Sequence, residues 1–179
     1  MIIEEGNIKL RFVEISDAEF ILKLRNDSVK SRFISPTSAD LVSQRKWIAD
    51  YKLREEKNEE FYFIAIDQFN KEFATYRLYN RTKESIEIGS FISAPLYSNP
   101  FNVISVDLVM KSFAFCDLGY EKICFEVRKE NKSVVNYHKA FQPILISEDS
   151  LNYYFELHKI NFLNNKLKFN KHILNHKTN

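Results

Sequence analysis

The sequence contains few of the residues that break or cross-link a chain. Only 3 glycines, 4 prolines and 2 cysteines occur among its 179 residues. So little glycine and proline argues against a disordered, low-complexity or loop-rich protein. Cys116 and Cys124 lack the spacing of a metal site, so we interpret both as reduced packing residues and expect no bound metal.

Neither sign of charge dominates, and long apolar runs are absent. The 26 basic and 24 acidic side chains give a net charge of +2, so a nucleic-acid partner is not expected. No apolar run approaches the roughly 20 residues of a membrane span. The first residues, "MIIEEG", are acidic where a signal peptide is basic. We therefore expect a cytoplasmic protein without membrane insertion.

What the sequence does contain is ample material for a core, since 45% of its residues are apolar. Alternating apolar residues and turn signals predict a series of strands. The expected strands cover 8–14, 60–67, 72–80, 84–92 and 121–128, with two more inside 144–162.

Helical patterns separate these strands. Ser16 and Glu19 form a predicted capping box for the first helix, and a second is expected from about Ser38. Gly119 is expected to close a helix that runs through 103–119, and Asn131 to begin the next one. The basic segment 163–179 is expected to be a tail or a short last helix. Because no linker or composition break occurs, we expect a single mixed α/β (α+β) domain over 1–179.

Three segments, in this order, carry a family resemblance: "IEIGSFI", "FAFCDLGYEKICFEV" and "ENKSVVNYHKAF". Together they resemble the GNAT superfamily of acyl-CoA-dependent N-acyltransferases. The resemblance covers roughly residues 84–141, with weaker agreement over 8–67. It implies a mixed, mostly antiparallel sheet of about seven strands, splayed between the fourth and fifth, with helices on both faces.

An earlier segment, "LRNDSVKSRFIS" followed by "QRKWI", is similar to one branch of that superfamily. Enzymes of this branch, which include flagellin-sugar acetyltransferases, acylate the amine of nucleotide-linked deoxyamino sugars. The resemblance implies transfer of an acetyl or short hydroxyacyl group to a dTDP-3-amino-3,6-dideoxyhexose, for bacterial surface glycans. The acceptor amine would attack directly in a ternary complex.

Arginine forks suit phosphate oxygens, and aromatic faces suit bases or sugars. On that basis the expected substrate-binding residues are Arg25, Asn26, Arg32, Trp47, Tyr76 and Arg77. Each also fits a solvated charge or a packed aromatic residue. Arg77 and Tyr79 should share one face of their strand, with Tyr76 on the other.

The family's cofactor loop carries an Arg or Gln and alternating glycines, and here those positions hold Ser98, Asn99, Phe101 and Val103. Asn99 is expected to cap the helix that follows, so that helix-start N–H groups hold a coenzyme A phosphate. Lys132 or Lys111 would support the other phosphates. The expected cofactor contacts are Phe91, Ile92, Ser93, Asn99, Phe101, Asn102, Val103, Asn131 and Lys132.

The resemblance implies that Tyr137 donates a proton to the departing thiolate, although a tyrosine packed on the sheet fits the same position. Glu87 points away from the isoleucine face of its strand and is the candidate general base or amine-orienting carboxylate, although a lone carboxylate on a strand more often faces solvent. Gly89 suits either a close backbone approach or a bulge. His138 is expected at the surface.

Three functions stay open at this point. The first is the sugar N-acyltransferase. The second is a protein or amino-acid N-acetyltransferase of the same fold, and the third is a non-catalytic binding or scaffold module that has lost coenzyme A. The sequence also leaves open whether the chain forms a homodimer.

Overall fold

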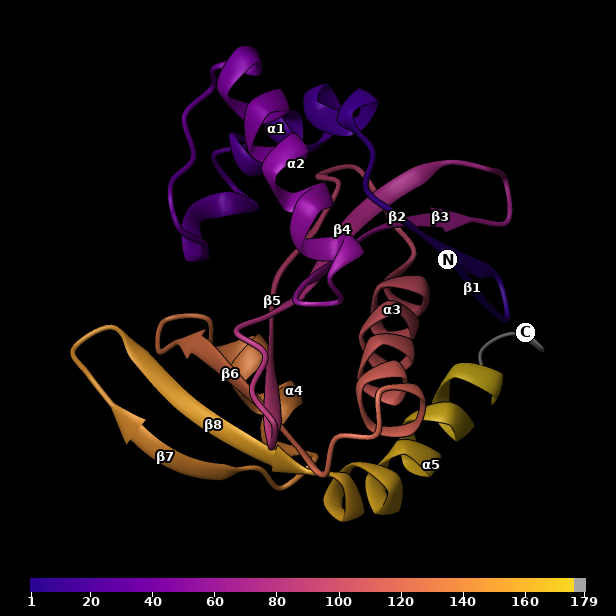
Figure 1. Ribbon diagram of the computed structural model, residues 1–179. Coiled ribbons are helices and arrows are strands. Elements are labelled where there is room, and N and C mark those ends of the chain that lie inside the picture. Colours follow the sequence, from indigo (N-terminus) through magenta and orange to yellow (C-terminus); the bar gives the residue numbers. More distant parts are fainter. Residues whose placement is uncertain (176–179) are drawn as a thin grey trace. The chain divides into compact units, whose positions relative to one another are not determined.

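The computed structural model describes residues 1–175, with side chains through Phe169. Eight strands form one sheet in the order β1-β2-β3-β4-β5-β6-β8-β7 (Figure 1). The chain divides into two compact units: Met1–Arg81 with Ile88–Asp107, and Thr82–Glu87 with Leu108–Asn179. The single domain expected over 1–179 remains a prediction. The last four residues of the predicted tail, 176–179, lie outside the described residues.

The first unit contains an antiparallel meander flanked by helices. Its strands are β1 (Ile2–Glu5), β2 (Ile8–Phe12), β3 (Phe61–Asp67) and β4 (Glu72–Tyr79), and β5 (Ser85–Ser93) is shared with the second unit. Its helices are η1 (Ile15–Asp17), α1 (Ala18–Arg25), η2 (Ser31–Phe33) and α2 (Leu41–Glu56), and α3 (Pro100–Ser112) begins in this unit.

The predicted strands agree with the observed ones to within one or two residues, except at the N-terminus. β1 was not predicted; it pairs with β2 across a turn in which Gly6 has a φ of 63°. β1 is almost entirely exposed, so it lacks the alternation of apolar and polar residues that marks a half-buried strand. This strand raises the count from the expected seven or so to eight.

Helices cover both faces of the first unit's sheet. On one face α1 and α2 lie side by side (Figure 1). Ile21 of α1 and Ile48 and Tyr51 of α2 pack there against Tyr62 and Ile64 of β3, and all five side chains are buried. On the other face the buried Tyr76 donates a hydrogen bond from its hydroxyl to Asp107 of α3, at 2.8 Å.

The first two helices begin one to three residues from their predicted starts. Asp17, not Ser16, stabilises the first helix: its carboxylate accepts the Glu14 N–H at 2.8 Å and is bound by two Arg11 nitrogens. The capping-box prediction was therefore wrong. α2, expected from about Ser38, begins at Leu41, and Asp40 caps it by accepting the N–H groups of Val42 and Ser43.

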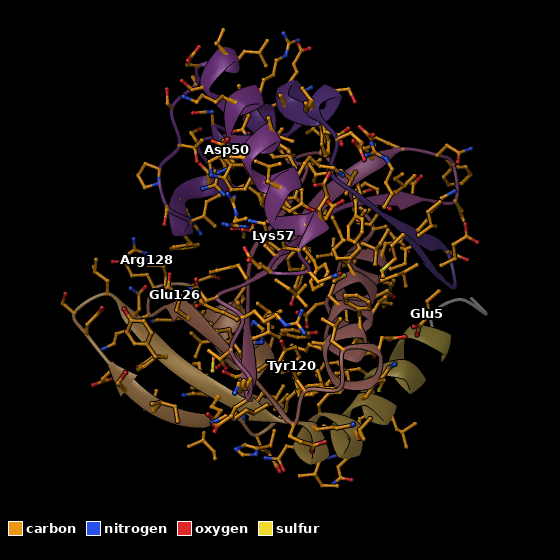
Figure 2. The ribbon with its side chains drawn as sticks, viewed as in Figure 1. Glu5, Asp50, Lys57, Tyr120, Glu126 and Arg128 are labelled. Atoms are coloured by element: carbon orange, nitrogen blue, oxygen red, sulfur yellow. The ribbon has the colours of Figure 1, made fainter. Side chains whose placement is uncertain are left out.

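The second unit holds the remaining strands, β6 (Lys122–Arg128), β7 (Ile144–Glu148) and β8 (Asn152–His158). Residues Ser85–Glu87 of β5 pair in parallel with Lys122–Cys124 of β6, and no further pairs continue this ladder among the described residues. β6 alternates as predicted, with Ile123, Phe125 and Val127 buried and Glu126 exposed (Figure 2).

The helices of the second unit are the end of α3, a π-helical turn η3 (Phe113–Asp117), α4 (Lys132–Lys139) and α5 (Lys159–Asn175). α5 begins inside a segment predicted as strand and is much longer than the short last helix expected. Phe162 explains this, since it is fully buried and packs on Phe115 and Phe141, with ring centroids 5.2 and 5.8 Å apart. None of the described helices has the length and apolar character that a membrane span requires.

Candidate functional site

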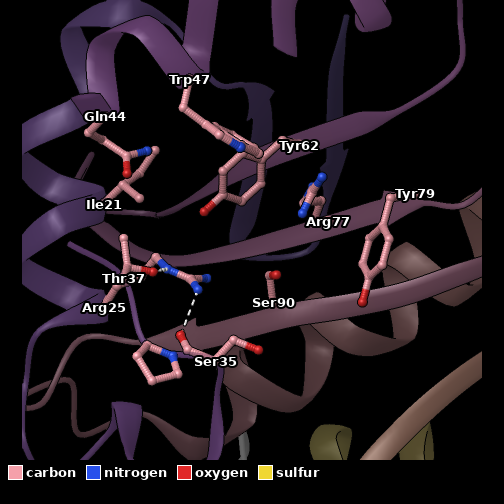
Figure 3. Close-up of a pocket in the computed structure, with 11 residues that line it drawn as sticks. Ile21, Arg25, Ser35, Thr37, Gln44, Trp47, Tyr62, Arg77, Tyr79 and Ser90 are labelled. Atoms are coloured by element: carbon pink, nitrogen blue, oxygen red, sulfur yellow. Dashed lines mark hydrogen bonds between the residues drawn. The ribbon is translucent and has the colours of Figure 1, made fainter. Parts of the chain in front are cut away.

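A cavity of about 410 Å³ lies within the first unit (Figure 3). Its size is typical of a small-molecule site. Both charged side chains that line it are arginines, and none of the described lining residues is acidic. The lining consists of Ile21 and Arg25 of α1, Ser35, Pro36 and Thr37 of the following loop, Gln44 and Trp47 of α2, Tyr62 of β3, Arg77 and Tyr79 of β4, and Ser90 of β5.

Arg77 is held in this cavity by two aromatic rings and one carboxylate. Its guanidinium carbon lies 4.9 Å from the ring centroid of Trp47 and 4.6 Å from that of Tyr79. Its Nε donates to the carboxylate of Glu60. Nη1 and Nη2 have no hydrogen-bond partner among the described residues, so this edge of the guanidinium is available to a ligand in the bidentate manner that suits phosphate.

The aromatic wall beside Arg77 is closely packed. Trp47 stacks on Tyr51 with centroids 6.0 Å apart and meets the edge of Tyr62 at 5.9 Å. The Tyr51 hydroxyl accepts the Tyr62 N–H at 2.9 Å and bonds to Glu55, and burial raises the pKa of Tyr51. Burial also raises the pKa of Tyr62. Both phenols therefore remain neutral at physiological pH.

Arg25 lines the same cavity, but its guanidinium donates hydrogen bonds to residues of the protein. Its Nη2 donates to the Ser35 carbonyl at 2.9 Å, drawn as a dashed line in Figure 3, and its Nε donates to the Thr37 hydroxyl. These bonds hold the loop that forms one wall. Arg25 therefore contributes positive charge and a loop brace, whereas Arg77 presents a complete donor edge.

The floor of the cavity depends on an irregularity in β5. Ser90 has a φ of 50°, a conformation that non-glycine residues seldom adopt, and its carbonyl accepts the Thr75 hydroxyl at 3.2 Å. A Cβ added at Gly89 would lie 2.6 Å from the Tyr79 hydroxyl oxygen. The close approach allowed by Gly89 is therefore to the Tyr79 side chain, which supports Arg77.

Of the six predicted substrate contacts, the structure brings three together in the cavity: Arg25, Trp47 and Arg77. It places the other three outside this cavity, and their role as substrate contacts stays a prediction. Asn26 is exposed and its amide donates to the Leu22 carbonyl at the end of α1; Arg32 is exposed and stacks on Phe33. Tyr76 is buried on the opposite face of β4.

Several cavity residues escaped sequence reasoning, among them Gln44, Ser35, Thr37 and Ser90. These are small or polar residues of ordinary type, and no periodicity distinguishes them from solvent-exposed ones. Tyr79 had a usable signal, because alternation along the strand already placed it beside Arg77.

The glycine-free loop before α3 is closed by its own side chains. As predicted, Asn99 caps the helix: its side-chain oxygen accepts the N–H groups of Phe101 at 3.1 Å and Asn102 at 3.2 Å. The Val103 N–H reaches the Asn99 carbonyl at 3.4 Å. The three N–H groups expected to hold a phosphate are therefore already engaged, so they fit a pyrophosphate poorly unless Asn99 turns away.

Asn102, a predicted cofactor contact, braces the loop in this structure. It is 5% exposed, and its amide donates to the Tyr97 hydroxyl at 2.6 Å. Tyr97 stacks on Phe73 with centroids 4.1 Å apart, and partial burial raises its pKa. These contacts replace the glycine nest with packed side chains. The predicted contacts Phe91, Ile92 and Ser93 lie at the end of β5, within the first unit.

In the second unit Tyr137 of α4 lies among aromatic rings from the residues just after α4 and from α5. Its ring meets those of Phe141 and Phe169 edge-on, with centroids 5.5 and 5.4 Å away. The Lys111 ammonium lies 5.1 Å from the same ring. The ring is thus fixed by packing, independently of what its hydroxyl binds.

Lys111 and His138 are placed differently from what the sequence predicts. Lys111 is fully buried, with Nζ 3.3 Å from Nδ1 of His138 and 4.5 Å from the ring centroid of Phe141. It therefore cannot reach a solvent-exposed phosphate. His138 is half-buried and packs on Phe125, at 4.5 Å between centroids, so its predicted surface position was wrong.

The other predicted residues of the second unit lie at the ends of elements. Glu87 is half-buried and pairs across the ladder with Cys124, whose thiol pKa is raised by burial. Asn131 immediately precedes α4, but its side chain accepts the Ser133 hydroxyl and not a backbone N–H. Lys132 is exposed.

The comparisons with known proteins agree with this architecture. Residues 7–141 match the sequence profile of the acetyltransferase (GNAT) domain. FdhC, described as a nucleotide-linked sugar GNAT, is 33% identical, with a TM-score of 0.84 over 94% of this chain and 96% of its own. The comparison with curated proteins gave no match.

Two more distant structures share the fold alone. Spermidine N-acetyltransferase from Vibrio cholerae, solved with CoA and spermine, is 18% identical, with a TM-score of 0.75 over 89% of this chain and 99% of its own. Ribosomal-protein-S5-alanine acetyltransferase from Vibrio fischeri is 15% identical, with a TM-score of 0.75 over 88% and 96%. The matched domain, the mixed sheet and the likeness to FdhC together show that this chain belongs to the GNAT acetyltransferase family.

Proposed function

We propose that this protein is an acyl-CoA-dependent N-acyltransferase that acts on the amine of a nucleotide-linked amino-dideoxy sugar. A dTDP-3-amino-3,6-dideoxyhexose destined for a bacterial surface glycan is the acceptor we favour. The observation that carries the proposal is the cavity of the first unit, with Arg77 stacked between Trp47 and Tyr79. The 33% identity to a nucleotide-linked sugar GNAT supports the same acceptor class.

The charge of the cavity separates this proposal from its rivals. Its charged lining residues are Arg25 and Arg77, and the described lining has no carboxylate. A polyamine or a basic peptide would meet two guanidinium groups there and gain no ion pair. A nucleotide diphosphate, in contrast, supplies phosphate oxygens for the Arg77 edge and a flat base for the aromatic wall.

Members of the family use acetyl-CoA, and we propose acyl-CoA as the donor here. The bound thioester supplies the activated acyl group, either acetyl or a short hydroxyacyl. In our proposal Tyr137 holds a proton for the departing sulfur, and Glu87 accepts or orients the proton of the acceptor amine. The backbone of residues 91–93 offers hydrogen bonds to the pantetheine arm.

A direct binding measurement tests the acceptor class. Calorimetry should show that dTDP alone binds saturably to the protein, whereas spermidine should give no saturable heat. The reverse pattern would contradict the proposal and favour a cationic acceptor. Efficient acetylation of peptide amines, with no dTDP binding, would favour the protein N-acetyltransferase.

The engaged N–H groups at the start of α3 predict a weak dependence on the coenzyme A phosphates. Acetyl-pantetheine should show a KM within about tenfold of that for acetyl-CoA, because the loop offers the pyrophosphate few unengaged donors. The Asn99→Ala substitution removes the cap and leaves these N–H groups open to the pyrophosphate. The KM for acetyl-CoA should then fall relative to the KM for acetyl-pantetheine, while the free energy of unfolding falls by about 1 kcal/mol.

Steady-state kinetics with both donors checks this prediction. A wild-type preference for acetyl-CoA of roughly a hundredfold or more would show that the loop does grip the phosphates. Millimolar coenzyme A that neither binds nor raises Tm would support the non-catalytic binding module instead.

A further inference from the structure

We propose that Glu60, which does not line the cavity, is a positioning residue for the acceptor site. It holds Arg77 so that Nη1 and Nη2 face the phosphates of a nucleotide. This inference rests on the proposed function, since it concerns the same cavity. Neither the family comparison nor the sequence patterns point to Glu60.

The contacts of Glu60 are divided between two arginines. Its side chain is 6% exposed; Oε1 accepts the Nε–H of Arg77, and Oε2 accepts the Nε–H of Arg54 at 2.8 Å. A carboxylate so deeply buried is stable only when it is paired and hydrogen-bonded. Each guanidinium is therefore held at Nε, which leaves its terminal nitrogens for other partners.

The two arginines also share an aromatic surface. The guanidinium carbon of Arg54 lies 5.5 Å from the Trp47 centroid, and that of Arg77 lies 4.9 Å from it. Ring contacts fix the plane of the Arg77 guanidinium, and Glu60 fixes its rotation within that plane. An arginine side chain has much rotamer freedom, so fixing it before the ligand arrives improves affinity without adding a ligand contact.

A carboxylate beside Arg77 does not remove the positive charge of the cavity, because a second arginine shares that carboxylate. Glu60 carries one negative charge, and Arg54, which is outside the cavity, supplies one positive charge to it. The charge of Arg77 therefore remains available to an anion. If Glu60 were paired with Arg77 alone, its negative charge would neutralise the guanidinium that it positions.

Glu60→Gln tests this directly, because glutamine keeps the volume but replaces one acceptor oxygen by an amide and removes the charge. We expect the affinity for dTDP to fall about tenfold, and the KM for the nucleotide-linked sugar to rise equally. The kcat and the KM for acyl-CoA should stay within about twofold of wild type, a split that general misfolding would not produce.

A double-mutant cycle provides the control. Arg77→Gln alone should lower dTDP affinity at least as much as Glu60→Gln, and combining the two should add little, because Glu60 acts through Arg77. Glu60→Asp, which keeps the charge but shortens the side chain, is the second variant if Glu60→Gln does not fold. It should weaken dTDP binding in the same direction.

The outcomes separate the two claims. Wild-type protein that does not bind dTDP overturns the proposed function itself. If Arg77→Gln weakens dTDP binding while the folded Glu60 variant binds as wild type, only the role of Glu60 is wrong. Fully additive effects in the double variant would likewise overturn it, since Glu60 would then act independently of Arg77.

Discussion

Replacing Tyr137 by Phe should lower kcat by about 10²–10⁴-fold while leaving the KM for both substrates nearly unchanged. The substitution removes one hydroxyl and keeps the ring, whose packing on Phe141 and Phe169 holds the side chain in place. The expected loss is therefore that of a proton donor to the departing sulfur. Steady-state kinetics across pH 6 to 9, with thermal melting to confirm folding, measures it.

Tyr153→Phe is the matched control for this experiment. Tyr153 lies on β8 of the same unit, where its ring packs near Lys129 and Lys139. The same loss of a hydroxyl there should leave kcat unchanged. If Tyr137→Phe keeps kcat within a few-fold of wild type throughout the pH range, Tyr137 is not the acid.

Arg77→Gln should weaken binding of the nucleotide-linked sugar by about 1–3 kcal/mol, which corresponds to roughly 5- to 150-fold in Kd. The physical reason is the loss of a charged, bidentate donor edge held between two aromatic rings. Acyl-CoA binding should barely change. Because remote binding also places the amine, kcat should fall to a smaller extent.

Arg32→Gln serves as the control for charge alone. Arg32 is another arginine that the sequence equally predicted as a substrate contact, but it is exposed and stacks on Phe33, outside the cavity. Its replacement should leave the KM for the acceptor within twofold of wild type. Equal losses in the two variants would mean that net charge, and not the Arg77 fork, attracts the acceptor.

Elements with one buried and one solvated face were predictable from the sequence. Ile123, Phe125 and Val127 occur at every second position, and all three are buried on β6. The same alternation placed Arg77 and Tyr79 together, with Tyr76 on the opposite face. Alternation at every second residue therefore predicted both the strand and the shared face of two residues that line the cavity.

Caps and boundaries were less predictable because distant residues decide between neighbouring candidates. Ser16 and Asp17 both suit a helix start, but Arg11 on β2 binds the Asp17 carboxylate at 2.7 Å. That choice depends on strand-to-helix packing and not on local preference. The start of α5 was misplaced for a similar reason, since Phe162 packs on Phe115 and Phe141, which precede it by 47 and 21 residues.

The candidate site shows the same limit. Glu60 follows three other acidic residues, Glu55, Glu56 and Glu59, and nothing local marks it. Its partner Arg77 is 17 residues away and meets it only when β3 and β4 pair. Lys111 was likewise predicted as a possible support for the coenzyme A phosphates, whereas aromatic rings from β6 and the segment around α4 enclose it. Pairings of this kind become visible only in three dimensions.

The most direct test compares kcat/KM for one amino sugar in its free and dTDP-linked forms, with acyl-CoA as donor and released thiol as the readout. If the cavity anchors the nucleotide, the linked sugar should be preferred by roughly a hundredfold or more, because anchoring serves both affinity and placement of the amine. Arg77→Gln should reduce that preference and leave turnover of the free sugar unaltered. Equal kcat/KM for the two forms would contradict the assignment of a nucleotide-linked acceptor.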